Sequence, residues 1–451
     1  MKFSPETIAV GTGGQLKRGG TDGTVCTDTR AISAGDWFLA LRGERFDAHD
    51  FLDAAIQAGA SGVIAERVPA DWTAGLVQVD DGLVALQNLG RHVRRGFEGP
   101  VVGITGSAGK TTTRALVGLA LDPLGVVHQT QGNFNNHIGL PLTLLAAPDD
   151  ADALVLEMGM NHAGEIDLLQ DIGEPNIRII TNVGAAHLEG LGSIEAVAAA
   201  KGELFDGARP GDTICLNLDD PYVSAHPLPD GVNVMTYGIH ENAQVRMLSA
   251  EVDPTTLYTH FTVQVGRETA SGIVPSPGIH MAHNAVGSIC VGTVLGLPLQ
   301  GMVERIGTYA PVGMRLRMEP GPLGTHIIND AYNANPMSVA ANLRTLAGIP
   351  RAPGRRRIAL LGDMLELGPT EIQQHRDTIA LAKTLDLDLL GLVGPRFEAA
   401  RDDDTLWAAD ASRLGEALRD HLQPGDIVLI KGSRGIKMER VLNGLDPKET
   451  A

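Results

Sequence analysis

The stretch VVGITGSAGKTTT, residues 101–113, joins an apolar strand pattern to a glycine-rich turn and then to a helical pattern. Glycines let backbone N–H groups turn toward phosphate oxygens, and the helix that follows presents its positive end to the same point. Lys110 can reach the β- and γ-phosphates of a nucleotide, while the Thr111 hydroxyl can coordinate Mg²⁺. We therefore predict a nucleotide-phosphate site here. Its loop residues are Gly106, Ser107, Ala108, Gly109, Lys110, Thr111 and Thr112.

The spacing of this loop differs from the standard phosphate-loop pattern. The position five before Gly109 is Ile104, and the loop glycine is Gly106 instead. The alternative is a glycine turn that happens to precede a lysine, but the order strand, loop, helix favours the nucleotide site. Such a loop occurs in ATPases, GTPases, kinases and ligases alike, so other parts of the sequence must indicate which reaction is catalysed.

The pattern around this loop predicts an α/β protein. Short apolar runs alternate with Ala- and Leu-rich helical runs, as expected for parallel strands buried on both faces and joined by right-handed crossovers. Gly- and Pro-containing segments at Gly96–Pro100 and Ala310–Gly313 divide the chain into predicted domains 1–98, 99–312 and 313–451. The predicted strands are Val101–Thr105, Ala153–Met158, Ile177–Thr181, Thr213–Leu216, Ile358–Leu361, Leu389–Val393 and Ile427–Ile430, and the predicted helices include Thr112–Leu121, Ile194–Phe205 and Ser338–Leu346.

The overall composition narrows the classes of partner. With 36 Lys and Arg against 54 Asp and Glu in 451 residues, the formal net charge is -18. That balance argues against nucleic acid as a partner and against anionic membranes, yet it allows a small anionic ligand in one positive cleft. Three scattered cysteines, no apolar stretch near ~18 residues and no signal-peptide pattern predict a cytoplasmic protein without membrane insertion.

Three further residues of the central segment are candidates for chemistry. Glu157 ends an apolar strand pattern downstream of the phosphate loop, where a Mg²⁺ ligand is expected. His187 follows another strand and turn, and lone histidines are often structural. Lys201 lies in an Ala-rich helical run, where a lysine is normally a surface residue. Judged by the neighbouring sequence alone, a functional role is favoured for Glu157 and not for His187 or Lys201.

The order of several motifs resembles the ATP-dependent Mur ligases. These motifs are TGSAGKTTT, the strand end at Glu157, TNVGAAHLEGLGS and AAAKGELF. Folylpolyglutamate synthases share the general plan. Further stretches are typical of the members that add a dipeptide, namely TQGNFNNHIGLPLTLL (130–145), EMGMNHAGEI (157–166), NDAYNANPMS (329–338) and LGDMLELG (361–368).

The resemblance implies a three-domain amide ligase of peptidoglycan precursor synthesis. An N-terminal α/β domain would bind the UDP end of the substrate, a central P-loop domain would bind ATP, and a C-terminal Rossmann-like domain would close over both. The implied substrates are UDP-N-acetylmuramoyl-tripeptide and D-alanyl-D-alanine, joined through an acyl phosphate with release of ADP. The chain is expected to act as a monomer in the cytoplasm.

The resemblance also implies roles for single residues. Lys110 would stabilise the transferred phosphoryl group. Thr111 and Glu157 would hold one Mg²⁺, and His187 and a carbamylated Lys201 would belong to a second. The expected ligand contacts are Asn284 for adenine, Arg315 for the γ-phosphate, Asp330 for the ribose, Thr29 and Arg30 for the uridine end, and Asn135 and Asn136 for the muramyl peptide; Tyr332 and Asn333 are candidates for the dipeptide.

Two alternatives stay open at this point. Arg317 competes with Arg315, because the family's Gly-Arg-Leu motif reads Gly313-Met314-Arg315-Leu316 here. For the function itself, the alternatives are another Mur or folylpolyglutamate-type ligase, and a P-loop ATPase or nucleotide switch whose output is a conformational change.

Overall fold

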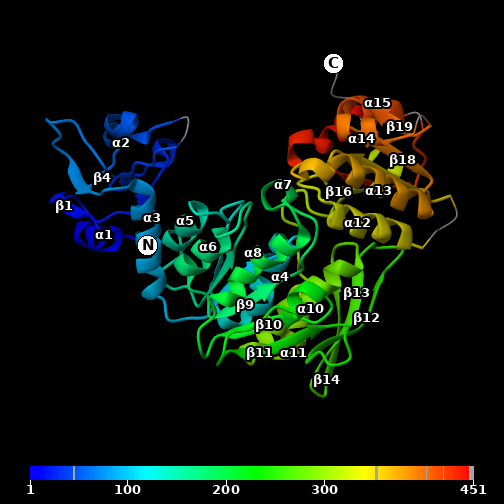
Figure 1. Cartoon of the computed structure of the whole chain (residues 1–451), viewed down its shortest axis with the longest axis horizontal. Coiled ribbons are helices and arrows are strands. Elements are labelled where there is room, and N and C mark those ends of the chain that lie inside the picture. The colour runs from blue at the N-terminus through cyan, green and yellow to red at the C-terminus, as the bar shows by residue number, and fades with distance from the viewer. Residues whose placement is uncertain (44–45, 351–353, 403, 420, 446–451) are drawn as a thin grey trace.

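The computed structural model describes residues 1–43, 46–350, 354–402, 404–419 and 421–445, which form three α/β units with one sheet each (Figure 1). The predicted α/β class with mainly parallel sheets is confirmed. The seven predicted strands and three predicted helices are present with shifts of no more than two residues at their ends. The three sheets fall inside the ranges 1–98, 99–312 and 313–451, while the domain limits themselves stay predictions.

The N-terminal unit is built on a five-stranded sheet of order β1-β5-β4-β3-β2. Only β1 runs antiparallel to its neighbour. The elements are α1 (Pro5–Thr12), β1 (Gln15–Arg18), β2 (Val25–Cys26), β3 (Trp37–Leu39), α2 (Leu52–Gln57), β4 (Gly62–Ala65), β5 (Gly75–Gln78) and α3 (Gly82–Arg95).

The central unit holds a nine-stranded sheet of order β14-β13-β12-β11-β10-β9-β6-β8-β7. The strands are β6 (Val101–Thr105), β7 (Val127–Gln129), β8 (Ala153–Glu157), β9 (Ile177–Ile180), β10 (Thr213–Asn217), β11 (Asn233–Gly238), β12 (Val245–Val252), β13 (Thr259–Val265) and β14 (Glu268–Val274). The helices are α4 (Lys110–Leu121), α5 (Gly139–Leu145), α6 (Glu165–Gly173), α7 (Leu188–Leu191), α8 (Ile194–Asp206), α9 (Pro221–Ser224), α10 (Ile279–Val294) and α11 (Leu299–Ile306).

Strand β6 is the point at which the strand order of this sheet reverses. It pairs in parallel with β8 on one side and with β9 on the other. The chain leaves β6 toward the β7 edge and later returns to β9, so a crevice is expected at the carboxyl end of β6. The predicted phosphate loop, residues 106–112, lies directly at that end.

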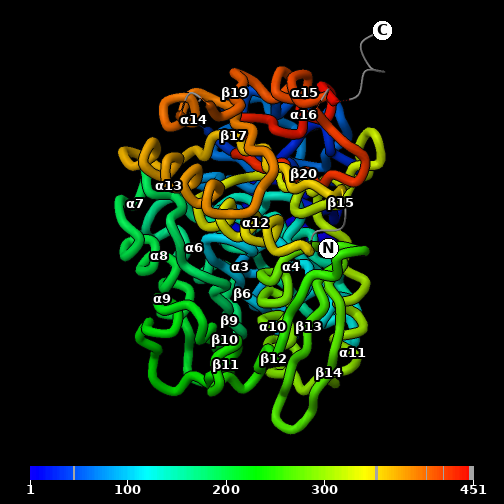
Figure 2. The backbone as a smooth tube through the Cα atoms, turned by 90° about the vertical axis from the view of Figure 1, so that its right-hand side faces the viewer, coloured from blue at the N-terminus to red at the C-terminus, as the bar shows by residue number. Residues whose placement is uncertain are grey.

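The C-terminal unit has a six-stranded sheet of order β15-β16-β20-β17-β18-β19, in which only β15 is antiparallel. Its elements are β15 (Arg317–Pro320), β16 (His326–Asp330), α12 (Pro336–Gly348), β17 (Arg357–Gly362), α13 (Glu371–Thr384), β18 (Leu389–Val393), α14 (Pro395–Ala400), β19 (Leu406–Ala408), α15 (Ala411–Arg419), β20 (Ile427–Lys431) and α16 (Val441–Leu445). Figures 1 and 2 both place α12 at the boundary with the central unit.

The apolar core of the central unit continues into the C-terminal unit. One cluster of buried side chains contains Leu116 and Ile289 of the central unit together with Leu343 and Leu361 of the C-terminal unit. The N-terminal unit has two clusters, around Trp37 and Phe38, and the Trp37 cluster also includes Leu145 of α5 in the central unit. The C-terminal unit is therefore packed against the central unit by shared apolar contacts.

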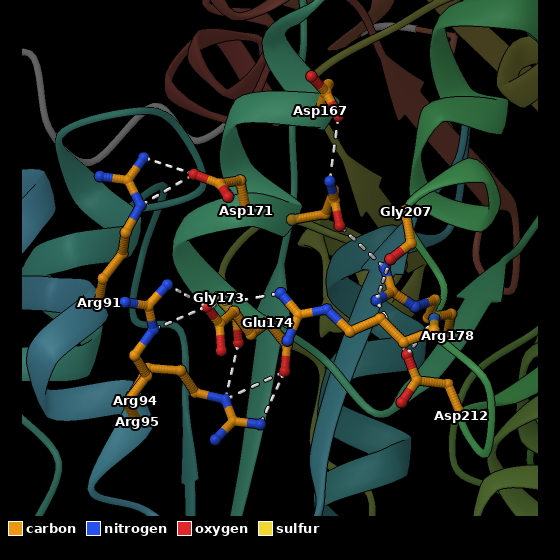
Figure 3. Close-up of polar contacts among 12 residues, drawn as sticks. Arg91, Arg94, Arg95, Asp167, Asp171, Gly173, Glu174, Arg178, Gly207 and Asp212 are labelled. Carbon is orange, nitrogen blue, oxygen red and sulfur yellow. Dashed lines mark hydrogen bonds and ion pairs between the residues drawn. The ribbon is translucent and has the colours of Figure 1, made fainter.

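Polar contacts hold the N-terminal unit to the central unit, where α3 lies beside α6 (Figure 3). Arg94 donates hydrogen bonds to the carbonyl oxygens of Gly173 and Glu174 at the end of α6. Arg91 bonds the Asp171 carboxylate at 2.6 Å, and Arg95 bonds the Glu174 carboxylate at 2.8 Å. Arginines thus satisfy the free carbonyl groups and the negative end of α6.

Candidate active site

A cavity of about 550 Å³ lies between the central and the C-terminal units. The central unit contributes the phosphate loop, and the C-terminal unit contributes the segments that follow β16 and β17. The predicted residues that line it are Ser107, Ala108, Gly109, Lys110, Thr111, Thr112, Asn135, Asn136, Glu157, His187, Asn284, Arg315, Asp330, Tyr332 and Asn333. The fold therefore gathers most of the predicted site into one cavity.

The two loop glycines are required by the backbone. Gly106 has a φ of 149°, and a Cβ built there would lie 1.9 Å from Thr181 Oγ1. Gly109 has a φ of 81° and precedes α4, where a Cβ would lie 2.9 Å from Asn284 Oδ1. Both positions combine a left-handed conformation with a close neighbour, so neither accepts a side chain without strain.

The loop following β9 braces the phosphate loop. Asn182 accepts a hydrogen bond from the Ala108 N–H at 2.9 Å and donates one to the Ala108 carbonyl oxygen at 3.1 Å. Ser107 Oγ accepts from the Gly184 N–H at 2.9 Å. Asn335, which caps α12, donates from the C-terminal unit to the Ser107 carbonyl oxygen at 3.2 Å. The loop is thus held from two sides before any ligand binds.

Lys110 begins α4 and bends back over the loop. Its Nζ donates to the Gly106 carbonyl oxygen at 2.7 Å. Burial lowers the pKa of the Lys110 ammonium group, and the negative charge of Glu157 opposes that effect. A desolvated cation at this point is suited to phosphate oxygens, which would replace the lost hydration.

Glu157 ends β8 beside the phosphate loop, as predicted, and is almost fully buried. Its Oε1 accepts from Asn135 Nδ2 at 2.8 Å, while Oε2 has no hydrogen-bond partner among the described residues. A second group without a hydrogen bond, Arg114 Nε on α4, lies 3.8 Å from that oxygen. Burial lowers the pKa of the Arg114 guanidinium. An orphaned carboxylate oxygen next to Thr111 in one cavity fits a divalent cation.

His187 faces a carboxylate of the C-terminal unit. It has a φ of 55° and precedes α7. Its Nδ1 lies 3.0 Å from Glu366 Oε2, an ion pair without hydrogen-bond alignment, since Nδ1 has no hydrogen-bond partner among the described residues. The adjacent His187 ring lowers the pKa of the Glu366 carboxyl, against the effect of burial. This contact crosses the boundary between the two units.

Lys201 is buried, which corrects the expectation that its helix alone would suggest. The residue is 1% exposed on α8, although a lysine in an Ala-rich helix is normally at the surface. Burial holds the pKa of the Lys201 amine well below its ordinary value, and the positive charge of Lys110 adds a smaller lowering effect. Lys201 lies outside the set of residues that line the cavity.

The two rival arginines differ in their surroundings. The Arg315 guanidinium carbon lies 3.6 Å from the centre of the Tyr332 ring, and both residues line the cavity. Arg317 begins β15, is largely exposed and lies 3.4 Å from Glu319. The geometry favours Arg315 for a ligand contact.

Asp330 is engaged by protein groups at the end of β16. Its Oδ2 accepts from Lys431 Nζ at 2.5 Å and from Asn342 Nδ2 at 2.6 Å, and its Oδ1 accepts from the Leu316 N–H at 3.0 Å. Lys431 also bonds the Asn333 carbonyl oxygen. Asp330 thus connects the segment before β15 with α12 and β20. Its predicted contact with the ribose stays a prediction.

The remaining predicted residues fall into two groups. Asn284 on α10 lies between the main cavity and a smaller one of about 200 Å³ and lines both. Asn136 Oδ1 accepts from the Gly139 N–H at 2.8 Å and thereby caps α5. Thr29 and Arg30 lie on the N-terminal unit and do not line the cavity; Arg30 is exposed and its hydrogen bonds lower the pKa of Asp28 to about 2.

Several residues at this site were not predicted to take part in it, among them Arg114, Asn335, Glu366 and Lys431. Arg114 follows Lys110 by one helical turn, and that spacing could have indicated it. Glu366 and Lys431 lie far along the chain and reach the cavity only through the packing of the C-terminal unit.

The fold and the cavity together define a P-loop nucleotide-binding protein with a C-terminal α/β unit packed over the phosphate loop. Family models match residues 24–89 (Mur ligase family, catalytic domain), 104–292 (Mur ligase middle domain) and 314–434 (Mur ligase, glutamate ligase domain). The chain belongs to the Mur ligase family.

Individual relatives agree with that assignment. UDP-N-acetylmuramoyl-tripeptide–D-alanyl-D-alanine ligase of Bacillus subtilis is 35% identical over 93% of this chain and 92% of its own length. The crystal structure of MurF from Acinetobacter baumannii matches 99% of both chains with a TM-score of 0.90 at 28% identity. MurF ligase from Thermotoga maritima, solved in complex with ADP, matches 94% of this chain and 97% of its own with a TM-score of 0.85 at 28% identity.

Proposed function

We propose that this chain is an ATP-dependent ligase that joins D-alanyl-D-alanine to UDP-N-acetylmuramoyl-tripeptide, a step of peptidoglycan precursor synthesis. The observation that carries the proposal is one cavity in which the phosphate loop and Glu157 face residues 332–335 of the C-terminal unit. Relatives of that name match this chain over more than nine-tenths of its length. ADP and phosphate are the expected products from ATP.

The first step transfers the γ-phosphoryl group of ATP to the tripeptide carboxylate. A carboxylate oxygen bonds the γ-phosphorus while the bond to the bridging oxygen of ADP breaks, giving an acyl phosphate. Lys110 and Arg315 supply positive charge where phosphate oxygens crowd together, which lowers the repulsion between the anionic reactants. The buried loop backbone fixes the phosphates for an in-line attack.

Thr111 and Glu157 would hold one Mg²⁺, and His187 with Lys201 a second, as the resemblance implies. Bound Mg²⁺ neutralises the charge that develops on the phosphate oxygens. The orphaned Glu157 oxygen fits the first ion. For the second, the lowered pKa of Lys201 favours its neutral amine, the form that reacts with CO₂ to give a carbamate.

The second step forms the amide bond. The dipeptide ammonium group first releases one proton to solvent, and the free amine nitrogen then bonds the acyl carbon with its lone pair. The nitrogen loses its second proton, and the tetrahedral intermediate expels phosphate as the C–O bond breaks. The packed C-terminal unit shields the acyl phosphate from water, which protects it from hydrolysis until the amine arrives. Tyr332 and Asn333 line the cavity on the side of this unit.

The remaining ligand assignments rest on the same resemblance. Thr29 and Arg30 would contact the uridine end, Asn135 and Asn136 the muramyl peptide, Asn284 the adenine and Asp330 the ribose. A monomer acting in the cytoplasm completes the proposal. Among the described residues, no helix combines the length and the apolarity needed to cross a bilayer.

An amine-dependent ADP-release assay tests this function. Wild-type protein should release ADP and phosphate when ATP, UDP-N-acetylmuramoyl-tripeptide and D-alanyl-D-alanine are all present. Release that depends on a single amino acid in place of the dipeptide would assign the chain to another ligase of the same plan. Hydrolysis without any amine would instead favour a P-loop ATPase or switch.

A further inference from the structure

The proposed reaction brings two anions and one zwitterion into the cavity, and the zwitterion, the dipeptide, carries the one ammonium group that must react. ATP and the peptide carboxylate are negatively charged, whereas the free amine of a dipeptide is largely an ammonium group near pH 7. The phosphate loop, Lys110 and Arg315 suit the two anions. The ammonium group needs an acceptor oxygen of opposite charge, so the carboxylates that line the cavity are its candidate partners.

Two of these carboxylates are already committed. Glu157 is buried and accepts from Asn135 through Oε1, and its other oxygen, Oε2, is assigned to Mg²⁺ in the proposed function. Asp330 accepts from Lys431 and from Asn342 on one oxygen and from a backbone N–H on the other. Neither can turn toward a new cation without breaking contacts that hold the site together.

The other two acidic residues of the lining differ sharply. Glu165 accepts from the backbone N–H groups of Asn161 and His162 at the start of α6. Glu366 Oε2 lies 3.0 Å from His187 Nδ1, the His187 ring and, with a smaller effect, the positive charge of Lys110 lower the pKa of this carboxyl, and the side chain is 57% exposed. Among the described residues that line the cavity, Glu366 is therefore the exposed carboxylate with an oxygen that is neither hydrogen-bonded to a protein group nor assigned to Mg²⁺.

The backbone around Glu366 is held in place on both sides. The Met364 N–H donates to His375 Nε2 at 3.0 Å, and the Leu365 N–H donates to Ser433 Oγ at 2.9 Å. His375 and Ser433 are themselves buried. Two other segments of the C-terminal unit thus fix this short loop, and the side chain that follows it is presented from a rigid support.

The conformation of Glu366 itself is unusual. Its φ is 65°, a left-handed conformation that costs a non-glycine residue free energy and persists where the surroundings impose it. Its carbonyl oxygen accepts from the Glu189 N–H at 3.3 Å, across the boundary to the central unit. The strained turn therefore aims the Glu366 side chain into the cavity when the two units are packed together.

We propose that Glu366 binds the ammonium group of the incoming dipeptide and holds its nitrogen beside the acyl phosphate, an assignment that rests on the proposed function. The carboxylate exchanges its contact with His187 for the ammonium group. Its negative charge disfavours the phosphates and any carboxylate at the same position, so charge separates the reacting ammonium group from the anionic groups. Glu366 belongs to the amide-forming step and has no part in phosphoryl transfer.

Two measurements on Glu366→Gln test this assignment. Gln keeps the size of the side chain and removes its charge. At saturating ATP and UDP-N-acetylmuramoyl-tripeptide, the KM for D-alanyl-D-alanine should rise about tenfold to a hundredfold, the range of a lost charged hydrogen bond. Without dipeptide, acyl phosphate formation, followed by positional isotope exchange in ATP, should keep its wild-type rate and Mg²⁺ requirement. Glu366→Asp should recover part of the dipeptide affinity.

The matched control is Glu189→Gln, a neighbouring acidic residue outside the cavity lining. It should leave the dipeptide KM unchanged. An unchanged dipeptide KM in Glu366→Gln would overturn the assignment. So would a loss of isotope exchange or a raised Mg²⁺ requirement, because either places Glu366 at the phosphate or at a metal ion. A wild-type protein that shows exchange but never uses the dipeptide would instead contradict the proposed function.

Discussion

At the scale of single residues, burial changes the chemistry of two basic side chains most. Lys201 is enclosed on α8, and burial together with the positive charge of Lys110 holds its pKa well below the ordinary value. His280 lines the main cavity, and burial lowers its pKa to about 4. Both groups therefore bind a proton less readily than their residue types suggest.

Lys201→Ala should lose most of the ligase activity, because the proposed carbamate supplies an anionic oxygen that alanine lacks. Short carboxylic acids such as formate or acetate should restore part of it by occupying the vacated space with a carboxylate. ADP release at increasing acid concentration measures the effect. Lys383→Ala, at an exposed lysine far along the chain, is the control and should keep full activity. Full activity in Lys201→Ala would refute the metal-bridging role.

His280 should make the protein sensitive to acid. Its folded-state pKa of about 4 lies below the ordinary 6.5, so between these values the unfolded chain binds a proton that the folded chain does not. The free energy of unfolding therefore falls as the pH drops from 6.5 toward 4. His280→Gln should remove up to roughly 3 kcal/mol of this loss. Urea unfolding at pH 7 and pH 5 measures it; equal pH dependence in both proteins would contradict the assignment.

At the scale of elements, the phosphate loop depends on its neighbours as much as on its own sequence. Gly106 packs against Thr181, and Gly109 packs against Asn284 on α10. Asn182 pairs with both backbone groups of Ala108. The strand β9 and the helix α10 therefore set the shape of the loop.

Gly106→Ala should therefore disturb the loop strongly. The new Cβ would meet Thr181 Oγ1 at 1.9 Å, and the φ of 149° is unfavourable for alanine. We expect a loss of about 1–3 kcal/mol of stability and a large loss of nucleotide affinity. Gly301→Ala on α11 has open space around the added methyl group and should be neutral or stabilising. Thermal unfolding and ADP titration distinguish the two; equal effects would contradict the packing argument.

Local patterns were sufficient for the elements of the fold. Buried strands such as β6 and β20 are short continuous apolar runs, and the alternation with helices left few topologies. The position of Glu157 at the end of β8 could be predicted for the same reason, because it follows from the strand itself.

Residues that act through packing of distant segments could not be predicted in the same way. Lys201 is buried because other parts of the central unit pack against α8, and the sequence of the helix alone does not reveal that packing. Glu366 meets His187 only when the C-terminal unit lies on the central unit. Asp330 was expected to face a ligand, yet Lys431, 101 positions later, bonds its carboxylate. Such pairings depend on tertiary structure.

At the scale of the whole molecule, two kinds of boundary join the three units. Arginines of α3 bind the end of α6 and hold the N-terminal unit through polar contacts (Figure 3). The C-terminal unit shares an apolar cluster with the central unit. The first boundary adds these polar contacts to a smaller apolar cluster that includes Leu145 of α5, whereas the second rests on the larger apolar cluster.

Arg94→Ala should loosen the N-terminal unit. It removes hydrogen bonds to the carbonyl oxygens of Gly173, Glu174 and Phe97, which we expect to cost about 1–3 kcal/mol. Hydrogen exchange should speed up at the end of α6 and in α3. Arg413→Ala, an exposed arginine on α15, is the control. Unchanged exchange in Arg94→Ala would show that apolar contacts alone hold this boundary.

The shared apolar cluster has a thermal consequence. Moving the C-terminal unit away from the phosphate loop would bring part of that cluster into contact with water, and hydration of apolar surface raises the heat capacity. Apolar burial weakens on cooling. The arrangement in which the C-terminal unit has moved away from the phosphate loop should therefore become more populated at low temperature. In that arrangement the C-terminal unit would hinder the release of ADP least.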